Sequence, residues 1–277
     1  MPNPNSVSEH YTHGALLDAI KVGVERLGKT TETVSVKDLG PVEEFHIGGR
    51  VATESFLERL ELAASDHVLD VGCGLGGASR FVADRYGARV TGIDLTKEYI
   101  ETGNTLTSWV GLKDLVELQE GDASKTLFSA ASFDKAFLMH VGMNIADKAA
   151  VAAELSRVLR KDGILGIYDV MSVGSEDLSF PVPWATSAEE SAVSSADEYK
   201  KVFGAVGFEV VTERNRRDFA LEFFDQLRAS TAASGGPPPL GLHILMGETA
   251  PLKVSNMIAN ISANKVAPVE LIFRQAS

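Results

Sequence analysis

The sequence predicts an α/β protein built on a doubly wound, mainly parallel sheet. Between residues 67 and 170, short β-rich runs alternate with longer segments whose apolar residues recur at helical spacing. This alternation indicates βαβ units, whose right-handed crossovers place helices on both faces of one sheet. A glycine-rich loop within "VLDVGCGLGGASR" (residues 68–80) joins the first predicted strand to a helix, as the corresponding loop does in dinucleotide binders.

Two helices are predicted before the first strand. In residues 14–27 the apolar side chains recur at helical spacing, and Gly28 ends the run. Residues 29–50 are interpreted as a polar connection that ends in "EEFHIGGR", and a second amphipathic helix is expected over residues 51–62. Because both helices precede the first strand, we expect them to cover a face of the sheet.

The strands and helices of the sheet then follow in alternation. Thr96 and Asp147 are expected to cap the second and third of its helices at their N-termini. The predicted strands cover residues 67–73, 88–94, 115–122, 133–141 and 164–170, and the predicted helices cover residues 76–87, 96–111 and 147–159.

After Val170 the pattern loosens into a loop over residues 171–194, followed by a helix over 195–207 and a strand over 208–214. The next segment is a long insert with an amphipathic helix, a Gly-Pro loop and a further helix near 251–263, and residues 267–274 form a closing strand. The predicted domains are an N-terminal helical lid or cover (1–62), a core (63–217), a cap insert (218–266) and a final core strand (267–277).

Composition excludes several classes of protein. The net charge of −12 over 277 residues leaves no basic stripe for nucleic acid or for an anionic membrane surface. Cys73 is the single cysteine, so no internal disulfide can form and a reducing compartment is expected. With no secretory signal, no apolar run of 18 residues and no cluster of residues at zinc spacing, we expect a cytoplasmic protein without a metal.

The glycine loop alone does not identify its ligand, because Gly72, Gly74 and Gly77 fit binders of NAD, of flavin and of S-adenosylmethionine (SAM) alike. Asp70 distinguishes between these classes of ligand. A carboxylate in the last turn of the strand opposes a pyrophosphate, which prefers N–H donors and a helix N-terminus. SAM has no phosphate, and its ammonium and sulfonium groups suit a carboxylate.

Two further acids end the next two predicted strands. Asp94, which precedes Leu95, is placed to accept hydrogen bonds from both ribose hydroxyls. Asp122 is placed to accept from the adenine amino group, while the N–H of Ala123 donates to a ring nitrogen. Carboxyl ends of parallel strands meet in one crevice, so we expect the three acids to share a site.

These motifs resemble those of the class I SAM-dependent methyltransferases. "VLDVGCGLGG", "GIDLT", "GDAS" and "ELSRVLRKDGILGI" resemble four of their motifs, over about residues 50–215. The nearest pattern is that of the small-molecule group, which includes sarcosine/dimethylglycine and sugar or quinone methyltransferases. The resemblance implies a Rossmann-like, seven-stranded sheet whose last strand is antiparallel, with N-terminal helices and helical cap inserts. It also implies SAM as cofactor and S-adenosylhomocysteine as product.

Candidate catalytic residues follow the fourth predicted strand. His140 lies at its tip and is the predicted general base, with Asn144 in the turn behind it to orient a nucleophile. His46 is a second candidate, since Gly48 and Gly49 let the backbone approach a ligand closely. Which histidine acts is left open. The cofactor-binding prediction comprises Asp70, Gly72, Cys73, Gly74, Asp94, Leu95, Asp122, Ala123 and His140, and the substrate-binding prediction comprises Tyr11, His46, Met143, Tyr168, Trp184 and His243.

The predicted function is transfer of a methyl group from SAM to a small-molecule acceptor by in-line displacement. The alternatives are an NAD(P)-dependent oxidoreductase on a similar sheet and a non-catalytic SAM-binding module. Two observations favour the methyltransferase. About 65 residues precede the strand that leads into the glycine loop, and Asp70 lies within the motif. Whether N, O or C is methylated is left open, as are the acceptor itself and a homo-oligomeric state.

Overall fold

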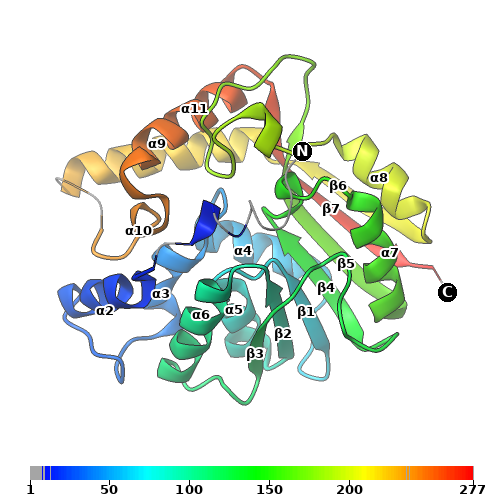
Figure 1. Cartoon of the computed structure of the whole chain (residues 1–277), viewed down its shortest axis with the longest axis horizontal. Helices are drawn as coiled ribbons and strands as arrows, with labels where there is room; N and C mark the ends of the chain where they lie inside the picture. Colours follow the sequence, from blue (N-terminus) through cyan, green and yellow to red (C-terminus); the bar gives the residue numbers. More distant parts are fainter. Residues whose placement is uncertain (1–7, 9, 13, 235, 237, 277) are drawn as a thin grey trace.

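The computed structural model describes residues 8, 10–12, 14–234, 236 and 238–276 (Figure 1). Its centre is one seven-stranded sheet with the order β3-β2-β1-β4-β5-β7-β6. The last strand pairs antiparallel with both β5 and β6, while the other pairings are parallel. The predicted fold class is confirmed. The strands are β1 (His67–Val71), β2 (Arg89–Asp94), β3 (Val116–Glu120), β4 (Phe133–Met139), β5 (Leu159–Ser172), β6 (Phe208–Asn215) and β7 (Val266–Gln275).

Helices cover both faces of this sheet (Figure 1). One face packs against α7 and α8, with Leu155 and Phe203 in its core, and the other packs against α4, α5 and α6, with Phe56 and Phe81 in its core. The helices are α2 (Leu16–Arg26), α3 (Val36–Glu43), α4 (Gly49–Leu57), α5 (Gly77–Tyr86), α6 (Lys97–Trp109), α7 (Lys148–Val158), α8 (Ala196–Gly204), α9 (Arg217–Ser234), α10 (His243–Met246) and α11 (Ala250–Ser262).

Short 3₁₀ turns connect several of these elements. They are η1 (Glu58–Leu60), η2 (Gly142–Asn144), η3 (Ala188–Glu190) and η4 (Gly247–Thr249). Among the described residues, no helix has the length and apolar character needed to cross a bilayer.

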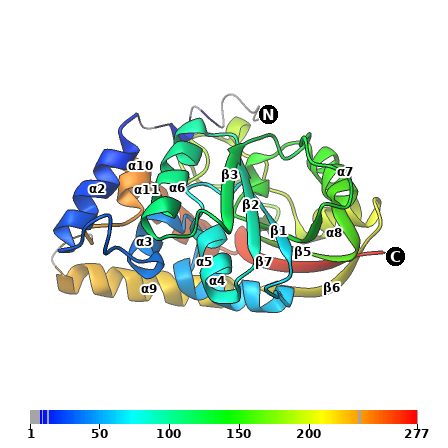
Figure 2. The same cartoon turned by 90° about the horizontal axis from the view of Figure 1, so that it is seen from below.

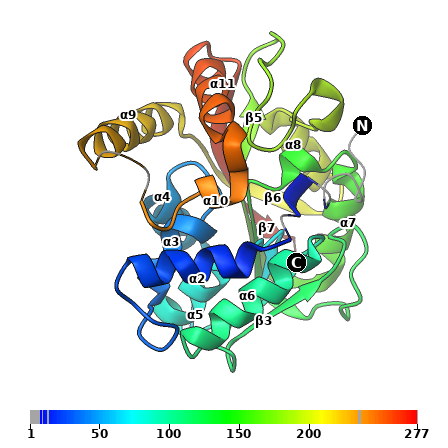
Figure 3. The same cartoon turned by 60° about the vertical axis from the view of Figure 1, so that its left-hand side comes forward.

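The late helices lie close to the N-terminal ones. Figure 3 shows α10 between α11 and α2, and Leu240 and Leu245 share a buried cluster with Leu16 and Ile20 of α2. Figure 2 shows α9 running beside α4. There the Phe219 ring lies so close to Gly48 that a Cβ on this residue would be 2.6 Å from it. Segments far apart in sequence are therefore packed together beside the sheet.

The segment predicted as a polar connection contains helix α3, so that prediction is wrong. Ser35 accepts a hydrogen bond from the Asp38 N–H, and the Asp38 side chain accepts one from the Ser35 N–H, which completes a capping box. Leu39 and Val42 are fully buried. Pro41 lies in the last turn of this helix, and the burial of the apolar face outweighs its cost. The following helix, α4, begins at Gly49 rather than at residue 51.

Candidate active site

A cavity of about 340 Å³ lies at the carboxyl ends of the first four strands. Every residue predicted to bind the cofactor lines it, as do the three predicted catalytic residues. The strand register explains this convergence, because Asp70 pairs with Gly92 and Asp94 pairs with Glu120, so that successive strands end at one edge. The cavity is lined from the sheet side by Asp70, Gly72, Cys73, Gly74, Asp94, Leu95, Asp122, Ala123, His140 and Asn144, and from the N-terminal segment by Tyr11 and His46.

The glycine loop makes a turn that other residues would strain. Gly72, Gly74 and Gly76 all have positive φ angles, of 70°, 54° and 82°. A Cβ on Gly72 would also lie 2.4 Å from the Val141 side chain. The N–H groups of Gly72 and Cys73 donate to the carbonyl of Ile93, which holds the loop against the end of β2.

The first two carboxylates of the cavity are supported differently. Asp70 is 2% exposed and accepts a hydrogen bond of 2.6 Å from the Ser79 hydroxyl. Burial raises the pKa of Asp70 to about 7, against the lowering effect of that hydrogen bond. Asp94 accepts from the N–H groups of Gly74 and Thr96, each at 2.9 Å, while burial raises its pKa. Asp94 therefore joins the glycine loop to the start of α6.

The remaining loop residues are fixed by short-range contacts. Oδ1 of Asp122 accepts from the N–H and the hydroxyl of Ser124, at 2.8 and 2.7 Å. Cys73 is buried, and burial raises the pKa of its thiol well above the usual value. A thiol held neutral in this way is a poor nucleophile. Asp147 caps α7 as predicted, whereas Thr96 occupies the N-cap position of α6 without a capping hydrogen bond from its side chain.

Two neighbouring histidines, His46 and His140, line the cavity. The His140 backbone has a φ of 56°, and the buried Nε2 atom of this residue has no hydrogen-bond partner among the described residues. Desolvation, and then the neighbouring His46, lowers the pKa of His140 well below its usual value. The two imidazole rings meet edge to face, with centroids 6.0 Å apart. Burial lowers the pKa of His46 to about 4, so both rings are neutral near pH 7.

Tyr11 and Asn144 meet across the cavity. The side chain of Asn144 hydrogen-bonds to the Tyr11 hydroxyl, and the Tyr11 ring packs against Phe45 and Tyr99 with centroids 6.1 and 6.0 Å apart. Residues 8, 10 and 11 are helical. The N-terminal segment therefore supplies part of the cavity wall.

Four residues predicted to bind substrate do not line the cavity. The Tyr168 ring packs on Phe56 across the sheet face, and its hydroxyl donates to the Ile47 carbonyl at 2.8 Å. Met143 and Trp184 are buried together in a separate apolar cluster. His243 begins α10 and lines a different hollow, between α10 and α2. Their positions after strands or in inserts did not reveal the direction of their side chains.

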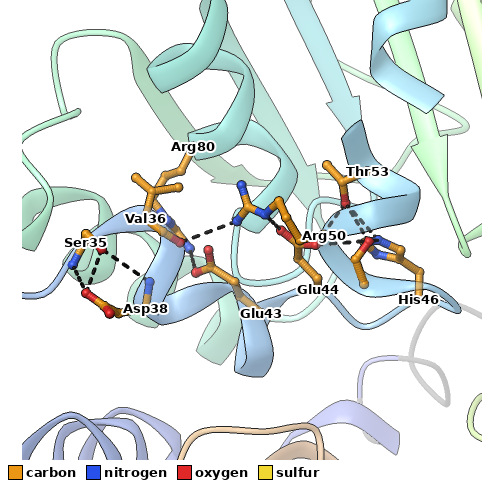
Figure 4. A network of polar contacts seen from close by, with 10 residues as sticks. Ser35, Val36, Asp38, Glu43, Glu44, His46, Arg50, Thr53 and Arg80 are labelled. Atoms are coloured by element: carbon orange, nitrogen blue, oxygen red, sulfur yellow. Dashed lines mark hydrogen bonds and ion pairs between the residues drawn. The ribbon is translucent and has the colours of Figure 1, made fainter. Parts of the chain in front are cut away.

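Sequence reasoning missed a buried polar network beside the cavity, shown in Figure 4. Glu43, which lines the cavity, forms an ion pair with Arg80, and both side chains are fully buried. Glu44 forms an ion pair with Arg50 and accepts a hydrogen bond from Thr53. The adjacent acids Glu43 and Glu44 before the histidine were the available signal, but Arg80, the partner of Glu43, lies 37 residues further along the chain.

Comparisons with known proteins identify the family of this chain. A methyltransferase domain family matches residues 69–167. The O-methyltransferase cnsE of Penicillium expansum is 31% identical over 229 residues, which cover 78% of this chain and 77% of that protein. The chain belongs to the class I SAM-dependent methyltransferases.

Other relatives match over shorter stretches. The "Probable tocopherol O-methyltransferase, chloroplastic" of Oryza sativa subsp. japonica is 44% identical over 91 residues, which cover 33% of this chain and 25% of that protein. The methyltransferase GfsG of Streptomyces halstedii is 31% identical over 140 residues, half of each protein. The chain thus matches from a quarter to half of the length of these two relatives.

Solved structures share the fold over the whole chain. Geranyl diphosphate C-methyltransferase from Streptomyces coelicolor A3(2) superposes with a TM-score of 0.73 at 18% identity, covering 100% of this chain and 99% of that one. The [4+2]-cyclase SpnF superposes with a TM-score of 0.69 at 20% identity, covering 99% and 97%. At such identities the likeness shows the fold alone, and the cyclase illustrates that one fold carries different activities.

Proposed function

We propose that this protein transfers the methyl group of SAM to a small-molecule acceptor bound in the cavity at the strand ends. The observation that carries this proposal is the charge of the cavity wall. The acids Asp70, Asp94 and Asp122 lie at the ends of three adjacent strands, and none of the described lining residues is Lys or Arg. Such a wall favours a cationic cofactor over a pyrophosphate.

The acids have separate roles in this proposal. Asp70 faces the cationic methionine end, Asp94 receives the ribose hydroxyls, and Asp122 with the Ala123 N–H receives the adenine edge. SAM supplies an activated methyl group, so the protein mainly positions the two reactants and excludes water. His140 lines the cavity and its Nε2 atom has no hydrogen-bond partner among the described residues, so in this proposal a hydrogen bond between His140 and the acceptor helps to position the acceptor.

Ligand binding tests the cofactor assignment before any acceptor is known. SAM and S-adenosylhomocysteine should raise the melting temperature, since both bind the native state, and NADH should leave it unchanged. Stabilisation by NADH alone would reject the proposal. Incubation of metabolite extracts with methyl-labelled SAM then identifies the acceptor by the labelled product.

Asp94→Ala tests the ribose contact. Loss of a charge-assisted, two-point contact should weaken SAM binding by about ten- to a hundredfold, as measured by calorimetry. Asp134→Ala is a suitable control, because Asp134 is the second residue of β4, at the other end of the strands, and does not line the cavity. Equal SAM affinity in Asp94→Ala and the unaltered protein would remove Asp94 from the site.

A further inference from the structure

A chain of hydrogen bonds leads away from the cavity behind His46 (Figure 4). Nε2 of His46 lies 2.9 Å from the Thr53 hydroxyl and 3.2 Å from the Gly49 carbonyl oxygen. The Thr53 hydroxyl lies 3.0 Å from Oε2 of Glu44, and Oε1 of Glu44 lies 2.5 Å from Nε of Arg50. Thr53 is fully buried, while the Arg50 side chain is 24% exposed. This series of hydrogen bonds therefore runs from the cavity wall towards the protein surface.

The partners fix which nitrogen of His46 carries the proton. A carbonyl oxygen can only accept, so the contact with Gly49 requires a proton on Nε2. The Thr53 hydroxyl then accepts from Nε2–H and gives its own proton to Glu44, at a shorter distance than its 3.4 Å contact with the Gly49 oxygen. Nδ1 of neutral His46 is left as a lone pair with no partner among the described residues, on a side chain that lines the cavity.

His140 lacks this support. Its Nε2 atom has no hydrogen-bond partner among the described residues, and besides burial the neighbouring His46 lowers its pKa. An imidazolium at His140 would thus be buried and uncompensated. His46 has a carboxylate one hydroxyl away. Of the two imidazoles, His46 is therefore the better proton acceptor.

We propose that His46 is the general base of the methyl transfer and that Thr53 and Glu44 form a relay that takes up the proton. As the X–H bond of the acceptor breaks, its proton goes to Nδ1 of His46 and its electron pair forms the bond to the methyl carbon. The electrons of the C–S bond remain on sulfur. The Nε2 proton passes to Thr53, and the Thr53 proton passes to Glu44, which becomes a neutral acid. This assignment rests on the function proposed above, with Thr53 and Glu44 as positioning residues.

The charges around Glu44 set the pH range of the relay. Burial raises the pKa of Glu44 to about 7, Glu43 and Glu54 add to this effect, and Arg50 and the Thr53 hydrogen bond oppose it. Glu43 is itself paired with Arg80. The relay accepts a proton only while Glu44 is ionised, so the rate should rise as pH increases through about 7.

The tautomer of His46 can be tested without an acceptor. In the complex with S-adenosylhomocysteine, nitrogen and carbon NMR shifts of His46 should show the Nε2–H tautomer. Thr53→Val should weaken this preference, because the Gly49 carbonyl is then the one hydrogen-bond acceptor left near Nε2 among the described residues, and Thr53→Ser should keep it in full. Thr91→Val is the matched control. Thr91 is a buried threonine whose hydroxyl lies 2.8 Å from Nε2 of a histidine, His67, and neither residue lines the cavity. An Nδ1–H tautomer in the unaltered protein would overturn the proposal.

Kinetics with the acceptor found by the labelling screen test the relay itself. Thr53→Val and Glu44→Gln should each lower kcat about 10²-fold, with the affinity for S-adenosylhomocysteine unchanged. Thr53→Ser should restore kcat, and Glu44→Gln should abolish the rise in rate near pH 7. A Thr53→Val enzyme with normal kcat and pH profile would overturn the relay. Failure of the unaltered protein to bind SAM would instead overturn the proposed function.

Discussion

At the scale of single residues, the two aspartates beside the glycine loop differ in how they are held. Asp94 accepts from two backbone N–H groups, which favour its ionised form. Asp70 is buried and accepts a hydrogen bond from the Ser79 hydroxyl, and burial raises its pKa to about 7. A cationic ligand beside Asp70 stabilises the carboxylate, so binding of SAM and ionisation of Asp70 should be coupled.

This coupling predicts a pH-dependent affinity for SAM. Below pH 7 the free protein holds a proton on Asp70, which must leave when the cation binds, so affinity should fall as pH falls through 7. Between pH 8 and pH 6 the loss should be about tenfold, because the ionised fraction changes by about that factor. Calorimetry at the two pH values measures it.

Asp70→Asn provides the comparison, because it removes the titrating group and keeps the side-chain shape. Its affinity should be lower at pH 8 and nearly independent of pH. If the unaltered protein binds SAM equally well at pH 6 and pH 8, Asp70 does not face the cationic end of the cofactor.

The acids that line the cavity could be predicted from the sequence, but the residues that hydrogen-bond to the site could not. The acids were found because parallel strands end at one edge, so a position at a strand end implies a position in the crevice. Ser79 and Thr53 lie within helices and carry no local sign of their partners. The direction of the Tyr168 side chain also depended on packing, since β5 is buried on both faces.

At the scale of elements, α3 shows how a short helix is specified by its cap. It has eight residues, one of which is Pro41, so the helix is too short for helical spacing of its apolar residues to be recognised in the sequence. The box formed by Ser35 and Asp38 supplies the missing start signal. This helix ends at Glu43 and so places the Glu43–Arg80 ion pair against α5.

Ser35→Ala should therefore destabilise the protein by about 1 kcal/mol, because the Asp38 N–H and the Asp38 carboxylate both lose a partner. For a chain of this size the melting temperature should fall by roughly 2–4 °C, which calorimetric scanning detects. Ser175→Ala is the control, since Ser175 is exposed in a loop and its side chain has no partner among the described residues. Equal melting temperatures for both variants would show that the cap adds nothing to stability.

At the scale of the whole molecule, the cavity is assembled from segments that are far apart in the chain. The doubly wound sheet follows from the alternation of strands and helices, and its antiparallel last strand follows from the resemblance to known methyltransferases. The contact between the N-terminal segment (residues 8, 10–12 and 14–16) and the η2 turn could not be predicted in this way, because periodicity reports on local structure only. The hydrogen bonds that hold this segment include those from Ser8 to Leu95, from Tyr11 to Asn144 and from Leu16 to Glu98.

The N-terminal segment should accordingly limit the escape of the cofactor. Tyr11→Ala removes the hydrogen bond to Asn144 and the ring contacts with Phe45 and Tyr99, each worth about 0.5–1.5 kcal/mol, so SAM should dissociate about tenfold faster. Tyr11→Phe keeps the rings and should show a smaller increase. Stopped-flow measurement of SAM release by displacement with S-adenosylhomocysteine gives the rates. Tyr86→Ala, which removes a ring packed on Phe81 outside the cavity wall, should leave them unchanged. Release from Tyr11→Ala at the rate of the unaltered protein would show that this segment covers the cavity without holding the cofactor in it.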